Sequence, residues 1–456
     1  MKEKMTSSEL LKKWKPVLEA EGVSEIKDLT RKKVVAQLLE NTEIGLQTGE
    51  MHGLMEAGTG LVATNASSDL QGDRKGYDPI LISLVRRTMP NLVAYDICGV
   101  QPMTGPTGLI FALRPKFVDL TNPNAPVLGA DAFYNEADSD FTGTGTQAGT
   151  TPAVLNQASP GTYTYGTGLA TIDGERLGTT AGNAFPEMGF SIDKVTVTAK
   201  TRKLKAQYTN ELAQDLRAIH GLDTEAELSA ILQGELLAEM NREVLRTVYT
   251  IAKPGAQHTD LTTLGTFDVS LDSNGRWAAE RFKGMFFQVE REANQIAKET
   301  RRGKGNIIIC SSDVASAFAM AGMLDVAPAL STNLTVDDTG NTFVGVLNGK
   351  YKVYVDPYAT TLTDGDNFFV IGYKGANSMD AGLFYAPYQA LQTYKAVDPD
   401  SYQPSTGMQT RYGMVMNPFA KGATAPSSTG APEANVNVYY RRVRVTNLAA
   451  SAAGVV

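Results

Sequence analysis

The sequence is poor in the residues that most metal and catalytic sites need. Its 456 residues include two cysteines and three histidines, His52, His220 and His258. No two histidines stand four residues apart, and the Cys/His cluster of a zinc site is missing. Cys98 and Cys310 adjoin apolar residues, so we expect two buried thiols in a reducing compartment rather than a disulfide. The sequence therefore predicts no metal and no cofactor.

The common nucleotide-binding and nucleophile motifs are also missing. No G-x-G-x-x-G follows the apolar strand expected at 306–311, and no G-x-S-x-G occurs. The spacing from Gly345 to Gly349-Lys350 does not fit a P-loop, and Tyr351 stands where a Ser or Thr is needed. We therefore expect that the chain is not an enzyme.

Long apolar runs and a net positive charge are missing as well. No apolar run approaches the 18 or so residues of a membrane span, and the N-terminus lacks the apolar core of a signal peptide. The net charge is −7, which argues against a protein held on nucleic acid by phosphate contacts. With 42% apolar and 20% charged residues, the chain is of the globular class, and its length indicates two to three domains.

Charge is concentrated at the N-terminus. Residues 1–56 hold nine Lys or Arg and ten Asp or Glu. Apolar residues recur there at helical spacing, from Leu10 to Leu18 and again from Val34 to Leu39. Such short amphipathic helices cannot form a core alone, so we expect them to pack on another part of the chain or on copies of themselves.

The stretch 118–187 is rich in Gly, Thr, Ala and Ser, poor in charge, and too long for an ordinary loop. We interpret it as a projecting loop with an inserted, largely β or irregular subdomain. The next segment, 191–208, alternates well, but Val195 and Leu204 belong to opposite phases of the alternation. That change of phase predicts a bulge or strong twist within a long strand.

The alternating segment is also basic, with the cations Lys194, Lys200, Arg202, Lys203 and Lys205. Nucleic-acid binding is one interpretation. However, the cations fall on both faces of the strand, and no aromatic residue is interleaved with them before Tyr208, so a stacking platform is missing. We favour a solvated or subunit-contacting strand and predict that these five residues take part in assembly.

Two long helices are expected in the second half of the chain. The pattern Thr224-x-x-Glu227 is typical of a capping box, and the apolar stripe after it continues to Ala252. This predicts the longest helix of the chain. A second helix is expected from Trp277 to Arg302, with Gly303 as its stop.

Strands dominate the rest. A strand at 306–311 should precede a helix capped by Asp313, and Asn348-Gly349 between alternating runs predicts a type I′ hairpin. Further strands follow, and no internal repeat is found. The whole is α+β with long projecting parts. Besides the enzyme and the nucleic-acid binder, a self-assembling structural protein therefore fits, because such arms complete their packing on neighbours.

The residues also match a known family over most of the chain. The chain resembles the major capsid proteins of T-even-type tailed phages. The resemblance is carried by "YDPILISLVRRTMPNLVAYDICGVQPMTGPTGLIFALR" (77–114), "EMGFSIDKVTVTAKTRKLKAQYTNELAQDLRAIHGLDTEAELSAIL" (187–232), "GRWAAERFKGMFFQVEREANQIA" (275–297), "GVLNGKYKVYVDPYA" (345–359), "VIGYKGANSMDAGLFYAPYQAL" (370–391) and "QTRYGMVMNPFA" (409–420).

This resemblance implies the Hong Kong 97-type phage capsid fold. Its expected parts are a helical scaffold-like propeptide at 1–56, an N-arm at 57–104, an extended loop at 105–208 with an inserted subdomain at 118–187, a peripheral domain with the long spine helix at 209–252, a mainly axial domain at 253–400, and a return to the peripheral domain at 401–456. The insertion is shorter than in the T-even prototype, so the resemblance leaves its fold open.

The resemblance further implies self-assembly into hexamers that form an icosahedral head shell around double-stranded DNA, without specific DNA binding. The implied partners are further copies of the chain, a vertex protein, internal scaffold proteins, a prohead protease, the portal and outer decoration proteins. The place of the protein would be the virion shell, assembled in the host bacterial cytoplasm. Two alternatives stay open: the pentameric vertex paralogue and an encapsulin-like compartment shell protein.

The family's prohead protease cuts after Glu when Leu or Ile stands two residues earlier and a small residue follows. The sequence Leu54-Met55-Glu56-Ala57 fits this rule, and it lies where the composition changes. We expect cleavage between Glu56 and Ala57, followed by expansion of the shell. The Val17-Leu18-Glu19-Ala20 sequence is a looser match and a candidate for a secondary cut. Removal of residues 1–56 leaves a net charge of −6, so an acidic shell would not hold packaged DNA tightly.

Overall fold

The computed structural model of the protein describes most of the chain. The described residues are 7–19, 26, 28–47, 92–119, 127–133, 136–149, 163–179, 184–273, 275, 277–326, 342–359, 367–398, 403–421 and 430–448. Helices and strands are mixed throughout, which confirms the predicted α+β class. In these residues no helix is both long and apolar enough to cross a membrane.

Two N-terminal helices, α1 (Ser7–Leu18) and α2 (Leu29–Gln47), pack against each other as a hairpin. The Trp14 indole of α1 is buried and donates a hydrogen bond to Glu40 Oε2 of α2 at 3.1 Å. The side of α2 that carries Leu38, which is fully buried, belongs to the main core, and α2 lies against strand β15. The expectation that these helices pack on another part of the chain is therefore confirmed.

One sheet has four strands in the order β1-β15-β16-β7. Their bounds are Gly99–Val100, Leu383–Val397, Pro404–Met416 and Lys200–Gln207. The short helix α5 (Ala94–Ile97) leads into β1. Strand β16 is antiparallel to both β15 and β7, whereas β1 runs parallel to β15.

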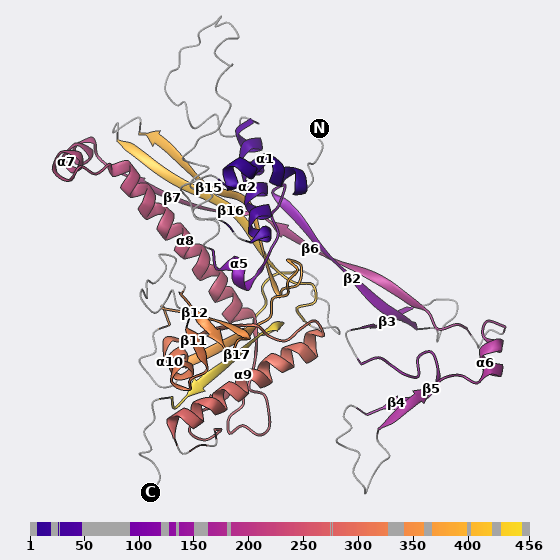
Figure 1. The fold of residues 1–456 in the computed structure, drawn as a ribbon. Helices are drawn as coiled ribbons and strands as arrows, with labels where there is room; N and C mark the ends of the chain where they lie inside the picture. The colour runs from indigo at the N-terminus through magenta and orange to yellow at the C-terminus, as the bar shows by residue number, and fades with distance from the viewer. Residues whose placement is uncertain are drawn as a thin grey trace, which may run out of the picture.

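Helix α7 (Asn210–His220) and the long helix α8 (Thr224–Ile251) follow β7. Helix α8 contacts β16 and β7, and it runs from this sheet toward the second sheet (Figure 1). It is the longest helix among the described elements, as predicted. Its cap differs from the prediction: Asp223 is the N-cap and accepts from the Glu225 amide, while Thr224 lies inside the helix. Both residue types are good caps, so the choice depends on backbone geometry.

The second sheet has eight strands. Its order is β11-β12-β13-β10-β14-β17-β8, and β9 also pairs with β17. In that order the bounds are Leu324–Val326, Thr342–Leu347, Tyr351–Val355, Ile307–Cys310, Asn367–Gly372, Asn437–Thr446, Ala252–Pro254 and, for β9, Thr266–Asp268. Helices α9 (Ala278–Thr300) and α10 (Ser312–Met320) pack on this sheet (Figure 1).

In this half of the chain the predicted turn is correct, and the predicted ends of two helices are close to those of the structure. Asn348 and Gly349 both have positive φ, 49° and 66°, so the predicted type I′ turn between β12 and β13 is confirmed. Helix α9 ends at Thr300, and the left-handed residue that stops it is Arg301 rather than Gly303. Gly303 instead allows close approach, because a Cβ there would lie 2.4 Å from the Tyr373 ring. The N-cap of α10 is Ser311, not Asp313.

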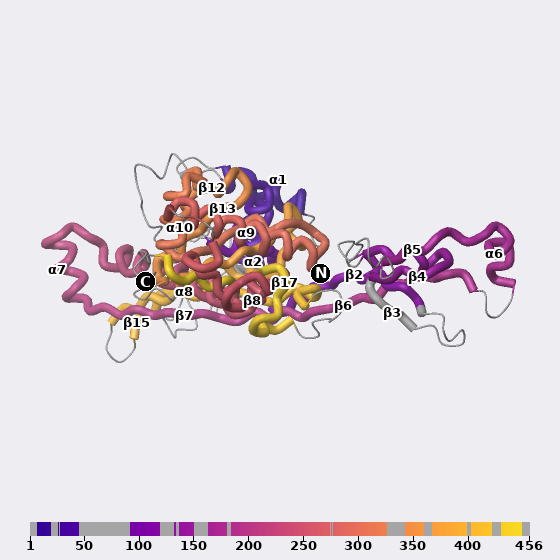
Figure 2. Tube along the Cα trace, turned by 90° about the horizontal axis from the view of Figure 1, so that it is seen from below, coloured from indigo at the N-terminus to yellow at the C-terminus, as the bar shows by residue number. Residues whose placement is uncertain are grey.

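A two-stranded ribbon projects from the body. It consists of β2 (Thr107–Asp119) and β6 (Met188–Thr198), with β3 (Val127–Asp131) paired to β2 near the far end. Strands β4 and β5 and helix α6 lie beyond it, at Thr144–Ala148, Thr164–Thr167 and Thr171–Arg176. Figure 2 shows α6 and α7 at opposite ends of the molecule, with the body between them.

The segment expected as one long strand is two strands in different sheets. Strand β6 ends at Thr198 and pairs with β2, whereas β7 begins at Lys200 and pairs with β16. Ala199 between them donates its amide to the Pro106 carbonyl. The change of alternation phase was a correct signal, but it marks a passage between sheets rather than a bulge. The extended ribbon is correspondingly shorter than expected.

The last strands do not all return to one sheet. Strand β16 pairs with β15, so the boundary expected at residue 400 separates two hydrogen-bonded partners. Strand β17 pairs with β14 inside the eight-stranded sheet.

Cys98 and Cys310 are free and fully buried, as predicted, and burial raises the pKa of each thiol to about 12.

Candidate assembly interface

The two faces of the β2–β6 ribbon have different surroundings. On the inner face, Ile110, Val195 and Val197 are buried in a small core with Met103 and Val415. Residues alternate between faces in a strand, so every second residue must point outward. The ribbon is therefore anchored to the four-stranded sheet at its base by one face only.

The outer face of the ribbon is apolar and exposed. Its large side chains are each between 51% and 61% exposed, and they are Leu109, Phe111, Leu113, Met188, Phe190 and Ile192. The register places Leu113 directly opposite Ile192, so the two strands contribute to one continuous surface. A contiguous apolar patch of this kind is typical of a protein–protein contact. The alternation at 191–208 predicted a strand here but did not indicate that this face is exposed.

The ribbon also lacks enough partners of its own. An isolated two-stranded ribbon is marginally stable, and β3 covers only the far part of one edge. Docking on another molecule would cover the apolar face and supply the missing packing. The geometry of the ribbon can therefore support association.

The predicted basic residues lie along the same stretch but in different settings. Lys194 is exposed on the outer face of the ribbon, opposite Phe111. Lys200, Lys203 and Lys205 are exposed on β7, the edge strand of the four-stranded sheet. They form a cationic edge next to the ribbon base, and their role in assembly stays a prediction.

Arg202 is engaged within the chain instead. Its guanidinium bridges to Glu239 Oε2 at 2.7 Å and to Glu243 Oε2 at 2.5 Å, both on α8. It also donates to the Tyr412 hydroxyl of β16. Arg202 therefore fastens β7 and β16 to the long helix, a role that the sequence could not indicate.

The predicted processing residues Leu54, Glu56 and Ala57 lie outside the described residues. The segment before them is described, and its docking on the body is specific. The buried Asn41 amide of α2 donates to two carbonyls, Met103 O at 2.8 Å and Tyr388 O at 2.9 Å. Met103 lies just before the ribbon, and Tyr388 lies in β15. A single side chain thus joins the N-terminal hairpin to the base of the ribbon and to the sheet.

A second contact holds the other end of α2. Arg31 pairs with Asp96 of α5 at 2.6 Å, and its guanidinium lies over the Tyr95 ring. The pair is partly exposed, so its contribution to stability is modest, below about 1 kcal/mol. The hairpin is therefore a docked element with both polar and apolar contacts to the body.

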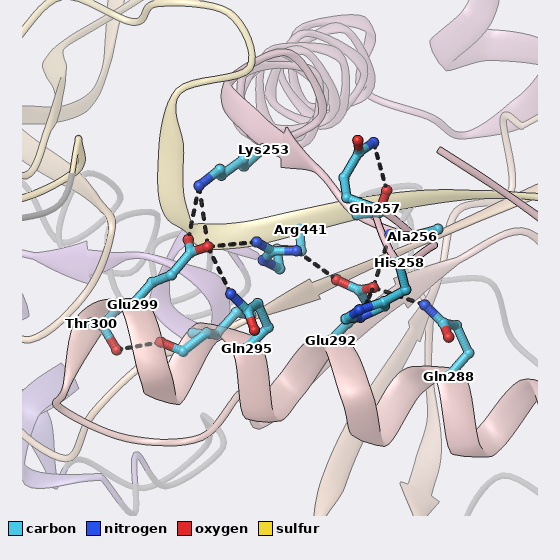
Figure 3. A network of polar contacts seen from close by, with 12 residues as sticks. Lys253, Ala256, Gln257, His258, Gln288, Glu292, Gln295, Glu299, Thr300 and Arg441 are labelled. Atoms are coloured by element: carbon cyan, nitrogen blue, oxygen red, sulfur yellow. Dashed lines mark hydrogen bonds and ion pairs between the residues drawn. The ribbon is translucent and has the colours of Figure 1, made fainter. Parts of the chain in front are cut away.

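Glu292, which is fully buried, belongs to a charged network inside the body (Figure 3). Arg441 of β17 donates to Glu292 Oε2 at 2.9 Å and to Glu299 Oε1 at 2.7 Å, both on α9. Glu292 also accepts from the Ala256 amide, and Glu299 accepts from Lys253. Burial alone would raise the pKa of Glu299, but Arg441 and the other donors lower it. The network joins α9, β17 and the chain after α8.

This network has a structural explanation that needs no ligand. Each carboxylate faces a cation and further donors, which is what buried charges require. Among the described residues, no group of three or more His, Cys, Asp or Glu side chains could hold a metal ion. We find no constellation of acid, base and nucleophile in the part of the chain that the structure describes.

Comparisons with known proteins agree with these observations. The family model "Major capsid protein Gp23" matches residues 75–445. The major capsid protein of Enterobacteria phage T4 is 38% identical, with 97% of this chain and 99% of that protein covered. That of Salmonella phage ViI is 39% identical, with 92% of each covered. A capsid vertex protein of phage T4 is 29% identical, but only 50% of this chain and 53% of that protein are covered.

Two solved phage structures show a low structural similarity to this chain. The capsid of Myoviridae phage XM1 gives a TM-score of 0.38 at 8% identity, covering 78% of this chain and 92% of that one. Mycobacterium phage Bobi gives 0.38 at 9% identity, covering 88% and 97%. These scores are low, so the assignment depends on the sequence relatives.

The long match fixes the family, and the arrangement of ribbon, long helix and central sheet is the Hong Kong 97-type capsid fold that the resemblance implied. The protein is a component of the virion capsid shell. The chain belongs to the family of Gp23 major capsid proteins, the shell-forming head proteins of T4-like phages.

Proposed function

We propose that this chain assembles into hexamers that tile an icosahedral head shell around double-stranded DNA. The observation that carries the proposal is the exposed apolar face of the β2–β6 ribbon, which projects from the body and needs a second copy to cover it. The ribbon acts as the extended loop of the fold, and α8 as the spine of the peripheral domain. The eight-stranded sheet is the axial part. The chain acts by association, not as an enzyme.

The ribbon can be tested directly. Phe111→Ser with Phe190→Ser removes two aromatic side chains that are each 61% exposed in the single chain. Burying such a side chain contributes about 1.5–3 kcal/mol, so we expect the concentration needed for assembly to rise at least about tenfold. The Phe111→Leu, Phe190→Leu chain is the matched control and should assemble nearly normally. Light scattering and electron microscopy follow the shells.

Folding must be measured alongside assembly. Because both side chains are exposed, the thermal midpoint of the unassembled variant should stay within about 2 °C of the parent. Normal assembly of the serine variant would contradict a ribbon-mediated contact. Native mass of the capsomers separates hexamers from the pentamers expected of a vertex paralogue. The shorter match to the capsid vertex protein favours the hexameric assignment.

We further propose that maturation cuts the chain between Glu56 and Ala57. Support comes from the Leu54-x-Glu56-Ala57 sequence and from the charged helical hairpin that precedes it. The cut would be made by a prohead protease of the same phage, and internal scaffold proteins, the portal, the vertex protein and outer decoration proteins are the further partners. Assembly would take place in the host bacterial cytoplasm, and the acidic shell would enclose DNA without binding it specifically.

Intact-mass analysis of purified particles tests the cut. A chain that begins at Ala57 is the expected result, and Glu56→Gln should leave residues 1–56 attached in assembled shells. Glu19→Gln is the matched control, because it alters only the looser Leu18-Glu19-Ala20 site. Mature parent shells that begin at Met1 would contradict the cleavage and favour an encapsulin-like container.

A further inference from the structure

A cavity of about 910 Å³ lies at the seam between the N-terminal hairpin and the body. Helices α1 and α2 line one side, with Leu10, Lys33 and Val34 among their residues. The other side is formed by the segment around Val100 and by the edge of the eight-stranded sheet near Lys352. Two parts of the chain that are far apart in sequence are therefore both needed to form the walls.

The cavity carries an excess of positive charge. Its charged lining residues are Arg31, Lys33, Lys350, Lys352, Lys374, Asp28 and Asp96. Arg31 forms an ion pair with Asp96 at 2.6 Å and lies 3.9 Å from Asp28, so both carboxylates have a cationic partner. Four lysines remain. Among the described residues, Lys350 lies 4.0 Å from Glu290, which Lys304 also holds, and Lys374 feels the charges of Asp96 and Asp28 from farther away.

The backbone brings two of these lysines together. Asn306 donates its side-chain amide to the Lys374 carbonyl at 2.7 Å and accepts from the Lys374 amide at 3.0 Å. The Asn306 carbonyl accepts from the Lys352 amide, also at 3.0 Å. One residue thus fixes the positions of Lys352 and Lys374 on neighbouring segments, so their proximity is part of the fold.

Lys374 is held where a charge is costly. Burial lowers the pKa of its ammonium; Cys98 and Asp96 oppose this shift in part, and Arg31 and Lys352 add to it. Its Nζ donates to the Tyr95 carbonyl, a neutral acceptor. A buried cation among like charges is destabilising unless an anion neutralises it. The lining therefore favours a ligand with several negative charges.

We propose that this cavity binds an acidic peptide segment of a partner protein, with its carboxylates on Lys33, Lys352 and Lys374. Apolar lining residues lie between the cations, including Leu10, Val34, Val100 and Pro102. A segment that mixes acidic and apolar side chains complements both features. Single-stranded nucleic acid fits less well. Tyr95 is the only aromatic residue in the described lining. The residue is 6% exposed and its ring lies under Arg31, so no base can stack on it.

The consequence of this site depends on the proposed cleavage after Glu56. The cut would release the hairpin and with it the wall that carries Leu10 and Lys33. The site would then exist only in the uncut chain. A partner bound there inside the shell would therefore dissociate when the shell matures. Binding itself needs neither cleavage nor assembly.

The test uses the full uncut chain, unassembled, at low salt. The probe is a fluorescein-labelled peptide of about ten glutamates and leucines, with a glutamine-for-glutamate peptide as its control. Fluorescence anisotropy gives the affinity of the parent and of Lys33→Gln, Lys352→Gln and Lys374→Gln. Each variant should weaken binding about fivefold, since one such ion pair is worth about 1 kcal/mol. Lys203→Gln, an exposed lysine on β7, should stay within about twofold.

The outcomes separate the alternatives. Weakening by both the hairpin variant Lys33→Gln and the body variant Lys374→Gln, with no effect of Lys203→Gln, supports the seam site. Equal weakening by all three variants would mean that the peptide binds through the overall charge of the protein, and it would overturn the proposal. Binding of the glutamine peptide would overturn it as well. Tighter competition by single-stranded DNA than by unlabelled acidic peptide would overturn it in favour of nucleic acid. Lys374→Gln should not lower the thermal midpoint, because it removes a buried charge. Intact mass of mature shells tests the cleavage separately.

Discussion

The buried ion pair between Arg441 and Glu292 gives a sharp test of what holds the body together. Arg441 is 4% exposed and Glu292 is fully buried, with 2.9 Å between Nη1 and Oε2. In Arg441→Met the carboxylate keeps two neutral donors, the Ala256 amide and the Gln288 side chain, each at 2.8 Å. It loses the Arg441 guanidinium, while His258 Nε2 stays 4.0 Å from Oε1, and Glu299 loses one of its cations.

The expected cost is large because the charge stays buried after its partner has gone. Removing one member of a buried pair costs about 3–5 kcal/mol, whereas replacing both members by neutral groups costs far less. We therefore expect Arg441→Met to lower the free energy of unfolding by about 3 kcal/mol or more. The Arg441→Met, Glu292→Gln double variant should recover a substantial part, since the remaining amide carries no charge.

Urea unfolding of the unassembled chains, followed by circular dichroism, measures both variants and the Glu292→Gln single variant. The coupling between the two positions comes from the complete double-mutant cycle. Arg202→Met is a useful comparison, because that guanidinium is partly exposed and should cost less. The argument fails if Arg441→Met costs under about 1 kcal/mol, or if the double variant is as unstable as the single one.

Two further predictions follow from other polar contacts. Asn41→Leu should lower the free energy of unfolding by about 2–3 kcal/mol, because it leaves the carbonyls of Met103 and Tyr388 without this donor. Hydrogen exchange of the α2 amides should become faster. Exchange as slow as in the parent would contradict the docking. The pKa of Glu299 is lowered in the folded protein. Its contribution to the free energy of unfolding is therefore fully present above the usual pKa of 4.5 and is lost as the pH falls through the lower pKa of the folded state. Unfolding free energies between pH 6 and about 3 should therefore fall less steeply for Glu299→Gln than for the parent.

Local patterns predicted the local structure well, with errors of a residue or two at the ends. Asn348-Gly349 gave the correct turn because only such residues accept positive φ at both positions. The caps of α8 and α10 were wrong by one and two residues, because Asp, Ser and Thr are all good caps when adjacent. Backbone geometry decides between them, and it depends on how the helix meets its neighbours.

Pairing between distant strands could not be predicted in the same way. The alternation at 437–446 identifies a strand, but nothing in it names β14 as its partner. The alternation at 188–192 likewise identifies a strand with one apolar face. It does not say whether that face is covered by the same chain or by another copy. Phe190 and Val195 look alike in sequence, yet one is 61% exposed and the other 1%.

The packing of the hairpin on the body was expected, but its polar contact was hidden, because a buried Asn41 looks like a surface residue in a charged helix. Its position has a consequence within the proposed function. Asn41 lies on the segment that the cut after Glu56 would free, and its acceptor Met103 packs with Ile110 and Val195 at the ribbon base. Departure of the hairpin would expose this carbonyl to water and remove one support of the base. Cleavage would thus also weaken the packing at the base of the ribbon, because Asn41 and Met103 join the two.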